Sequence, residues 1–238
     1  MSTVVLPKEQ IERILHDADW FFNAADWYRE RGVPYRRGYL FSGPPGCGKT
    51  SLVIALASYF YRPIYVLNLG DIWTDSKLFS AISTVPVNGI LLIEDVDVAG
   101  KTREIRPKKN GEKGKLNMNT TTTSGLLNGI DGVISKDGRL LIMTTNYPDK
   151  LDAALIRPGR IDKHEHIGPL DPKDAGRLFL NFFPKEFELA TKLTTEISNS
   201  IPAAELQSVF MINNSDPVRA LFQIVDRYNP NVEPEEEL

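Results

Sequence analysis

The stretch that decides the fold of this 238-residue chain reads Gly43-Pro44-Pro45-Gly46-Cys47-Gly48-Lys49-Thr50. It matches the phosphate-binding loop pattern G-x-x-x-x-G-K-[ST] at every fixed position. A short apolar run at residues 38–41 precedes it and predicts a buried strand, and residues 49–60 have the spacing of a helix. Because the context is strand, loop and helix, we interpret the stretch as a phosphate-binding loop and not as a glycine-rich turn that matches by chance.

The loop chemistry suits a nucleotide. Glycines let successive backbone N–H groups curl around phosphates, which also meet the positive end of the helix dipole. Lys49 would supply a charge for the β- and γ-phosphates, and the Thr50 hydroxyl could ligate Mg²⁺. Cys47 stands at a variable position, and we interpret it as a small filler rather than a nucleophile. The residues predicted to contact the nucleotide are Gly43, Pro44, Pro45, Gly46, Cys47, Gly48, Lys49, Thr50 and Ser51.

Outward from the loop, strand and helix patterns alternate. Helices are predicted at 8–30, 75–84 and 124–134, and strands at 64–69, 90–93, 140–144 and 164–167. Thr74 is predicted to cap the helix that begins at Asp75. This alternation predicts an α/β fold with a parallel sheet covered on both faces.

After Gly168 the strand signals end. Asp171 and Pro172 read as an N-cap followed by proline at the first helical position, and only helices are predicted from there to Tyr228. We therefore predict a core domain at residues 1–168 and a small helical domain at 169–230. Residues 100–123 are polar and largely basic, which predicts a mobile insertion, and the acidic residues 231–238 are predicted to be a disordered tail.

Two acids end a buried strand. Ile90-Leu91-Leu92-Ile93 is followed directly by Glu94 and Asp95. Ligand sites of open α/β sheets lie at the carboxyl ends of their strands, and carboxylates placed there are costly unless a metal or water needs them. An N-cap acid beside a surface acid is the simpler alternative, and the phosphate loop argues against it.

Two further segments carry candidate site residues. Asn146 follows the strand at 140–144, where its amide could orient a water molecule, although asparagine is also a common turn residue. Arg157 and Arg160 flank Pro158-Gly159, and this rigid turn predicts that both guanidinium groups point outward. Surface arginines are often simply solvated.

Composition narrows the function classes. The formal net charge of −3 gives no overall electrostatic case for nucleic acid. Cys47 is the only cysteine, so an intrachain disulfide is impossible and a reducing compartment is compatible. We expect any membrane anchor to lie outside this chain, since no apolar run is long enough to span a bilayer and the start lacks signal-peptide features.

The order and spacing of these segments resemble the AAA family over nearly the whole chain. The shared segments are the phosphate loop, the strand ending in two acids, Thr144-Thr145-Asn146 and Ile156-Arg157-Pro158-Gly159-Arg160. Residues 31–40 and 124–133 are similar to one AAA subgroup, which includes a mitochondrial inner-membrane chaperone that moves the folded Rieske iron–sulfur protein across the membrane.

The resemblance implies a RecA-like P-loop ATPase core followed by an all-helical AAA lid. It implies ATP and Mg²⁺ as ligands, with Thr50 and Glu94 on the metal side and Asp95 as the base that activates water. Asn146 would sense the γ-phosphate, and Arg157 and Arg160 would reach a neighbouring subunit's nucleotide. Most AAA proteins have Asp before Glu, so the reversed order here leaves the individual roles of the two acids open.

The resemblance also implies a homo-oligomeric ring, a hexamer or heptamer, that remodels or translocates a protein substrate. If it extends to the full-length protein, the location is the matrix face of the mitochondrial inner membrane; otherwise it is the cytoplasm. Two alternatives stay open, a nucleic-acid-handling motor and a regulatory switch that assembles on ATP. A zinc site at His164 and His166 is disfavoured because no cysteine or third histidine lies nearby.

Overall fold

The computed structural model describes residues 4–69, 74–98, 123–131 and 137–228. The predicted insertion at 100–123 and the tail at 231–238 lie almost wholly outside these ranges. By its internal contacts the chain forms two compact units. One comprises Ala18–Ser42 and Phe60–Glu165, and the other comprises Met1–Asp17, Gly43–Tyr59 and His166–Leu238.

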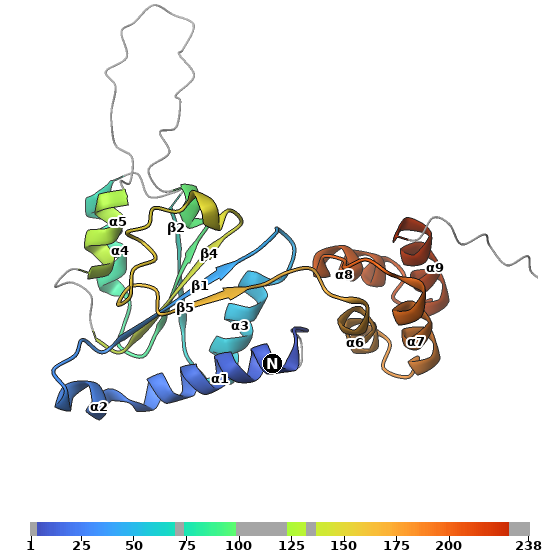
Figure 1. Ribbon diagram of the computed structural model, residues 1–238, viewed down its shortest axis with the longest axis horizontal. Coiled ribbons are helices and arrows are strands. Elements are labelled where there is room, and N and C mark those ends of the chain that lie inside the picture. The colour runs from blue at the N-terminus through green and yellow to red at the C-terminus, as the bar shows by residue number, and fades with distance from the viewer. Residues whose placement is uncertain (1–3, 70–73, 99–122, 132–136, 229–238) are drawn as a thin grey trace, which may run out of the picture. The chain divides into compact units, whose positions relative to one another are not determined.

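A five-stranded parallel sheet runs through the first unit in the order β2-β3-β4-β1-β5 (Figure 1). The register pairs Ser42 of β1 with Thr145 of β4, and Ile93 of β3 with Met143 of β4. The α/β class predicted from the alternating pattern is therefore confirmed. The strands are β1 (Arg36–Ser42), β2 (Ile64–Asn68), β3 (Ile90–Glu94), β4 (Arg139–Thr145) and β5 (Lys163–His166).

Helices α4 (Asp75–Thr84) and α5 (Thr123–Asp131) pack on one face of the sheet through a shared apolar core. Leu78 and Ile82 lie four residues apart on α4, so they share one buried face of the helix. They join Leu91 and Ile93 of β3 and Leu126 of α5 in this core. The predicted cap of α4 is confirmed, because the Lys77 N–H donates to the Thr74 hydroxyl at 3.2 Å.

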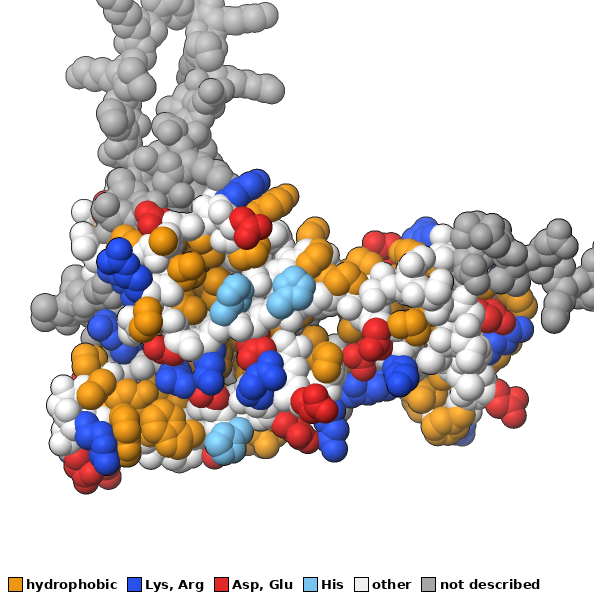
Figure 2. Space-filling view, in the orientation of Figure 1, with side chains coloured by type: hydrophobic (Ala, Val, Ile, Leu, Met, Phe, Trp, Pro, Cys, Tyr) orange, Lys and Arg blue, Asp and Glu red, His pale blue; other side chains and the backbone are white. Residues whose placement is uncertain are grey.

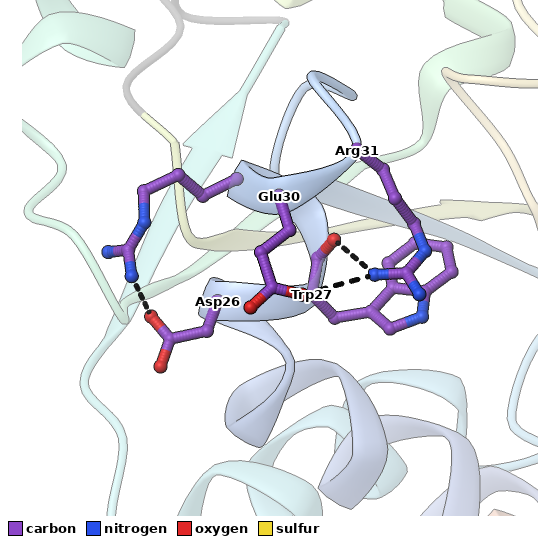
Figure 3. Close-up of polar contacts among 5 residues, drawn as sticks. Asp26, Trp27, Glu30 and Arg31 are labelled. Atoms are coloured by element: carbon purple, nitrogen blue, oxygen red, sulfur yellow. Dashed lines mark hydrogen bonds and ion pairs between the residues drawn. The ribbon is translucent and has the colours of Figure 1, made fainter.

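The predicted helix at 8–30 is two helices, α1 (Lys8–Asn23) and α2 (Ala25–Glu30), which break at Ala24. The break lets Tyr28 turn inward, where its ring lies 5.0 Å from that of Tyr35. On the outer surface of α2, Arg29 pairs with Asp26 at 2.6 Å and Arg31 stacks over the Trp27 ring (Figure 3). Exposed pairs of this kind contribute little, so the buried tyrosine is the main anchor of α2.

The second unit holds α3 (Lys49–Tyr59) and a helical bundle built around one apolar core (Figure 1). As predicted, the part of the chain described after Gly168 is helical, and the Asp171 carboxylate caps the first of these helices by accepting the Asp174 N–H at 2.7 Å. Val5, near the start of the described chain, packs into the same core. The bundle helices are α6 (Pro172–Phe182), α7 (Phe187–Glu196), α8 (Ala203–Ile212) and α9 (Pro217–Tyr228).

Gly38 of β1 marks the closest backbone approach in the sheet unit. A Cβ atom on Gly38 would lie 1.6 Å from the carbonyl oxygen of Arg160, which is a backbone atom and cannot rotate away. The Asp162 N–H donates to the Gly38 carbonyl at 2.8 Å, so the two segments are also hydrogen-bonded there. Only glycine allows this contact.

We therefore expect Gly38→Ala to lower the free energy of unfolding by about 3 kcal/mol, the upper part of the usual cost of overpacking. Gly32→Ala is the matched control, because Gly32 has a φ of 61° and nothing within 4 Å of a built Cβ. It should cost only about 1 kcal/mol for its left-handed backbone. Thermal unfolding followed by circular dichroism compares the two variants. Equal losses in both would mean that the close approach is unimportant.

Candidate functional site

The phosphate loop connects Ser42, the last residue of β1, to α3. Its glycines adopt φ values that other residues rarely take: 142° at Gly43, 76° at Gly46 and 94° at Gly48. Positive φ values are inexpensive for glycine alone, so the loop's curvature depends on these three residues. Thr50 and Ser51 stand exposed in the first turn of α3.

Lys49 is buried at the base of the loop. Its Nζ donates to the carbonyl oxygens of Gly43 and Pro44, each at 2.8 Å. The ammonium group is therefore held by backbone dipoles of the loop itself. An anion that enters the curve of the loop would meet this charge directly.

Cys47 is buried within the loop. Burial raises the pKa of its thiol, and the nearby Lys49 charge opposes this only in part. A reactive cysteine needs a lowered pKa and access to solvent, and Cys47 has neither. This agrees with its interpretation as a filler.

The loop also contacts the helical bundle of its own unit. The N–H of Ala204, in the first turn of α8, donates to the Gly46 carbonyl at 2.9 Å. The Ala204 side chain faces Gly46 closely enough that a Cβ on Gly46 would lie 3.2 Å from it. The first turn of α8 therefore touches the phosphate loop.

In the sheet unit, Glu94 and Asp95 emerge from β3 at its carboxyl end. The four apolar residues before them are buried, Glu94 is half-buried and Asp95 is exposed. Asp95 has a φ of 48°, in the left-handed region, where aspartate is tolerated at some cost in strain.

Strand β4 and the residue that follows it supply the contacts that hold Asp95. The Asn146 Nδ2 lies 3.4 Å from Asp95 Oδ1, and the Asp95 N–H donates to the Thr144 hydroxyl at 3.3 Å. The structure thus brings together Asp95 and Asn146, two of the predicted site residues. Thr144 was not predicted, although it lies in the same strand end as Asn146.

A third acid belongs to this edge and was missed. Asp97 accepts a hydrogen bond from the Thr145 hydroxyl at 2.9 Å, and the same hydroxyl accepts the Tyr147 N–H at 3.0 Å. Thr145 is fully buried. The Glu94-Asp95-Val96-Asp97 spacing was visible in the sequence, but nothing there indicated that Thr145 would meet the last of these acids.

His164 lies beside the end of β1 and was considered only as a zinc ligand. Its Nε2 lies 2.8 Å from the hydroxyl of Ser42, which is buried. Within the described ranges, no three His, Cys, Asp or Glu side chains are grouped so that they could hold a metal ion. His164 therefore joins Ser42 among the polar side chains at the carboxyl ends of the strands.

The two arginines differ in orientation. Arg157 is exposed, but the Arg160 guanidinium donates through Nη1 to the carbonyl of Ala154 in its own chain. The prediction that both guanidinium groups point outward is thus wrong for Arg160. The chain folds back on itself at residues 154–160, which brings the Ala154 carbonyl within reach of Arg160.

None of the helices in the described ranges combines the length and apolar composition needed to cross a bilayer.

Comparison with known proteins identifies relatives over most of the chain. The Mitochondrial chaperone BCS1 of Homo sapiens is 40% identical over 229 residues, covering 93% of this chain and 54% of the relative. The Probable mitochondrial chaperone bcs1 of Schizosaccharomyces pombe is 42% identical over 223 residues, covering 93% and 48%. The Protein HYPER-SENSITIVITY-RELATED 4 of Arabidopsis thaliana is 35% identical over 222 residues, covering 90% and 38%. The chain spans about half the length of the chaperone relatives.

The family profile described as "ATPase family associated with various cellular activities (AAA)" matches residues 39–169. This match runs from β1 through the phosphate loop, Glu94 and Asp95, and the turn with Arg157 and Arg160 to the end of the sheet, and it covers more than half of the chain. The chain therefore belongs to the AAA family of ATPases, for which ATP binding and ATP hydrolysis are the implied activities.

Proposed function

We propose that this chain binds ATP with Mg²⁺ at the phosphate loop, hydrolyses it within a homo-oligomeric ring and uses the energy to remodel or translocate a protein substrate. The observation that carries the proposal is the preformed phosphate loop, which holds a buried lysine. In the other compact unit, a strained aspartate is held by an asparagine. We further propose that residues 1–168 form the ATPase core and residues 169–230 its lid.

Support for the nucleotide role of Lys49 comes from its surroundings. A buried ammonium group is costly unless it is hydrogen-bonded, and here two carbonyl oxygens at 2.8 Å hold it. Phosphate oxygens are stronger acceptors for a cation than carbonyl oxygens are. ATP binding would therefore exchange weaker partners of Lys49 for stronger ones without moving its side chain far.

Two properties of Asp95 support its role as the base, namely its exposure to solvent and its contact with Asn146. Its carboxylate is exposed to solvent, so water can approach it, while Asn146 fixes its direction. In the proposed step, the water oxygen bonds to the γ-phosphorus, Asp95 takes a water proton, and the bond to the β-phosphate oxygen breaks to leave ADP. Asn146 would hold both the carboxylate and the attacking water in line.

The donors proposed for Mg²⁺ are the Thr50 hydroxyl and the Glu94 carboxylate. Both are hard oxygen ligands of the kind that Mg²⁺ selects, and the cation usually completes its shell with water and phosphate oxygens. When bound, Mg²⁺ neutralises charge on the β- and γ-phosphates. Glu94 is half-buried, which suits a ligand that must be held still.

Arg157 is the better candidate for contact with a neighbouring subunit's nucleotide. It is exposed, whereas Arg160 is bound to Ala154 of its own chain. We propose that Arg157 reaches across the subunit contact and that Arg160 stiffens the turn from which Arg157 projects. A ring is built from such head-to-tail contacts, so every site would receive one arginine from the next subunit.

We propose a protein substrate because the chain is similar to relatives named mitochondrial chaperones. The distribution of charged side chains on the surface is the second reason. On the face shown in Figure 2, the Lys and Arg side chains of the described residues are interspersed with Asp and Glu side chains. A nucleic-acid motor would need a continuous basic groove along its backbone-binding track.

Lys49→Ala should abolish ATP binding or weaken it severely, because the loop loses its side-chain cation. Lys77→Ala is the matched control, since Lys77 is an exposed lysine on α4 and its loss should leave binding unchanged. Titration with a fluorescent ATP analogue measures both. Near-normal affinity in Lys49→Ala would contradict the role given to this residue.

Asp95→Asn should retain ATP and Mg²⁺ but slow hydrolysis by about 10²–10⁴-fold, the usual contribution of a general base. Glu94→Gln should instead shift the Mg²⁺ concentration needed for half-maximal activity upward. Nucleotide binding and steady-state turnover across a Mg²⁺ series separate the two effects. If the two variants show the opposite behaviour, the roles of the acids are exchanged.

A further inference from the structure

The arginine turn, residues 157–162, is compact by its own hydrogen bonds. The N–H groups of Arg160 and Ile161 both donate to the Arg157 carbonyl, at 3.1 and 3.2 Å. Ile161 is buried in the core of the sheet unit, which anchors one end of the turn. These contacts fix the shape of the turn, and Ile161 ties its end to the core of the sheet unit.

The Asp162 carboxylate connects the middle of the turn to the sheet. Asp162 Oδ2 accepts the N–H of Gly38 in β1 at 3.0 Å, and Oδ1 accepts the N–H of Gly159 in the turn at 3.1 Å. Both partners are backbone groups, and Asp162 lies two residues beyond Arg160. Asp162 is therefore a bridge between a strand of the sheet and the middle of the turn.

We infer that Asp162 is a positioning residue that sets the direction in which Arg157 leaves the subunit. This inference rests on the proposed function of Arg157. Gly159 has a φ of 86°, and its N–H is turned inward onto Asp162. The rigid Pro158 then links that fixed point to Arg157, so the Cα of Arg157 is held although its side chain is exposed.

Such anchoring matters because an arginine acting on a transferring phosphoryl group must arrive in the correct place. A long side chain loses entropy when it is ordered, and a fixed backbone reduces that cost. Displacement by about 1 Å, even from a change far from the chemistry, can cost about 10²-fold in rate. Removing the carboxylate would leave two N–H groups without their acceptor and free the turn to move.

The strand contact itself should survive such a change. The Asp162 N–H donates to the Gly38 carbonyl at 2.8 Å, and this bond belongs to the backbone. A side-chain substitution at Asp162 leaves it in place. The expected defect is thus in the turn and not in the sheet.

The test compares Asp162→Ala, Asp162→Asn and Arg157→Ala in the full chain. Asp162→Ala should lower kcat by roughly 10- to 100-fold with ATP affinity unchanged, since misplacement rather than loss of the arginine is expected. Asp162→Asn retains one acceptor oxygen and should fall between Asp162→Ala and the unaltered protein. Asp216→Ala is the control for general destabilisation, because it removes a comparable bond, from the Arg219 N–H at 2.9 Å, in the other compact unit.

Mixing experiments distinguish a displaced arginine from a damaged site. Asp162→Ala subunits keep an intact phosphate loop, and Lys49→Ala subunits keep an intact arginine turn. Mixed assemblies should therefore recover activity above the sum of the two separate variants, as mixtures of Arg157→Ala with Lys49→Ala should.

Three outcomes would overturn the inference. If Asp162→Ala turns over ATP normally while Arg157→Ala does not, Asp162 does not position the arginine, and the proposed function stands. If Arg157→Ala is rescued by mixing but Asp162→Ala is not, Asp162 acts on its own subunit. If Arg157→Ala is itself fully active, both the inference and the proposed role of Arg157 fail.

Discussion

Strands β3 and β4 are buried over nearly their whole length and hydrogen-bonded in parallel, and the polar groups of the candidate site depend on where these strands end. A buried strand has no room for an unpaired charge, so charged groups are confined to its ends. The register pairs Ile93 with Met143, which puts the residues that follow them at one level of the sheet. Asp95 and Asn146 meet for this reason, although 51 positions separate them in the chain.

Strand β1 positions two other parts of the site, the phosphate loop and the arginine turn. Its carboxyl end passes directly into the phosphate loop, and Gly38 within it is the point to which Asp162 ties the arginine turn. Strand β1 thus leads into the loop that would bind a subunit's own nucleotide. It also supports the turn whose arginine would act on the nucleotide of the neighbouring subunit. If the proposed ring forms, this shared support gives a physical route by which one site could influence the next.

Much of the fold could be predicted because its signals are local. The apolar run at Ile90–Ile93, the cap at Thr74 and the Asp171-Pro172 start of the helical region each depend on residues adjacent in the sequence, and the structure shows all three. What could not be predicted depends on contacts between distant segments. The break at Ala24 accompanies the packing of Tyr28 against Tyr35, and Arg160 turns inward to the Ala154 carbonyl. The Asp162 bridge and the pairing of Asp97 with Thr145 likewise join segments that only the folded chain brings together.

If ATP is hydrolysed at contacts between subunits, as proposed, the rate of hydrolysis per subunit must depend on assembly. The decisive experiment measures this rate as the protein is diluted. Assembly state would be followed over the same concentrations by mass photometry, with ATP and Mg²⁺ saturating. Arginines supplied across a contact are worth about 10³–10⁵ in rate in comparable enzymes, so the rate per subunit should collapse as the assembly dissociates. A rate per subunit that stays constant while the protein passes from assembly to monomer would show that hydrolysis does not need the subunit contact.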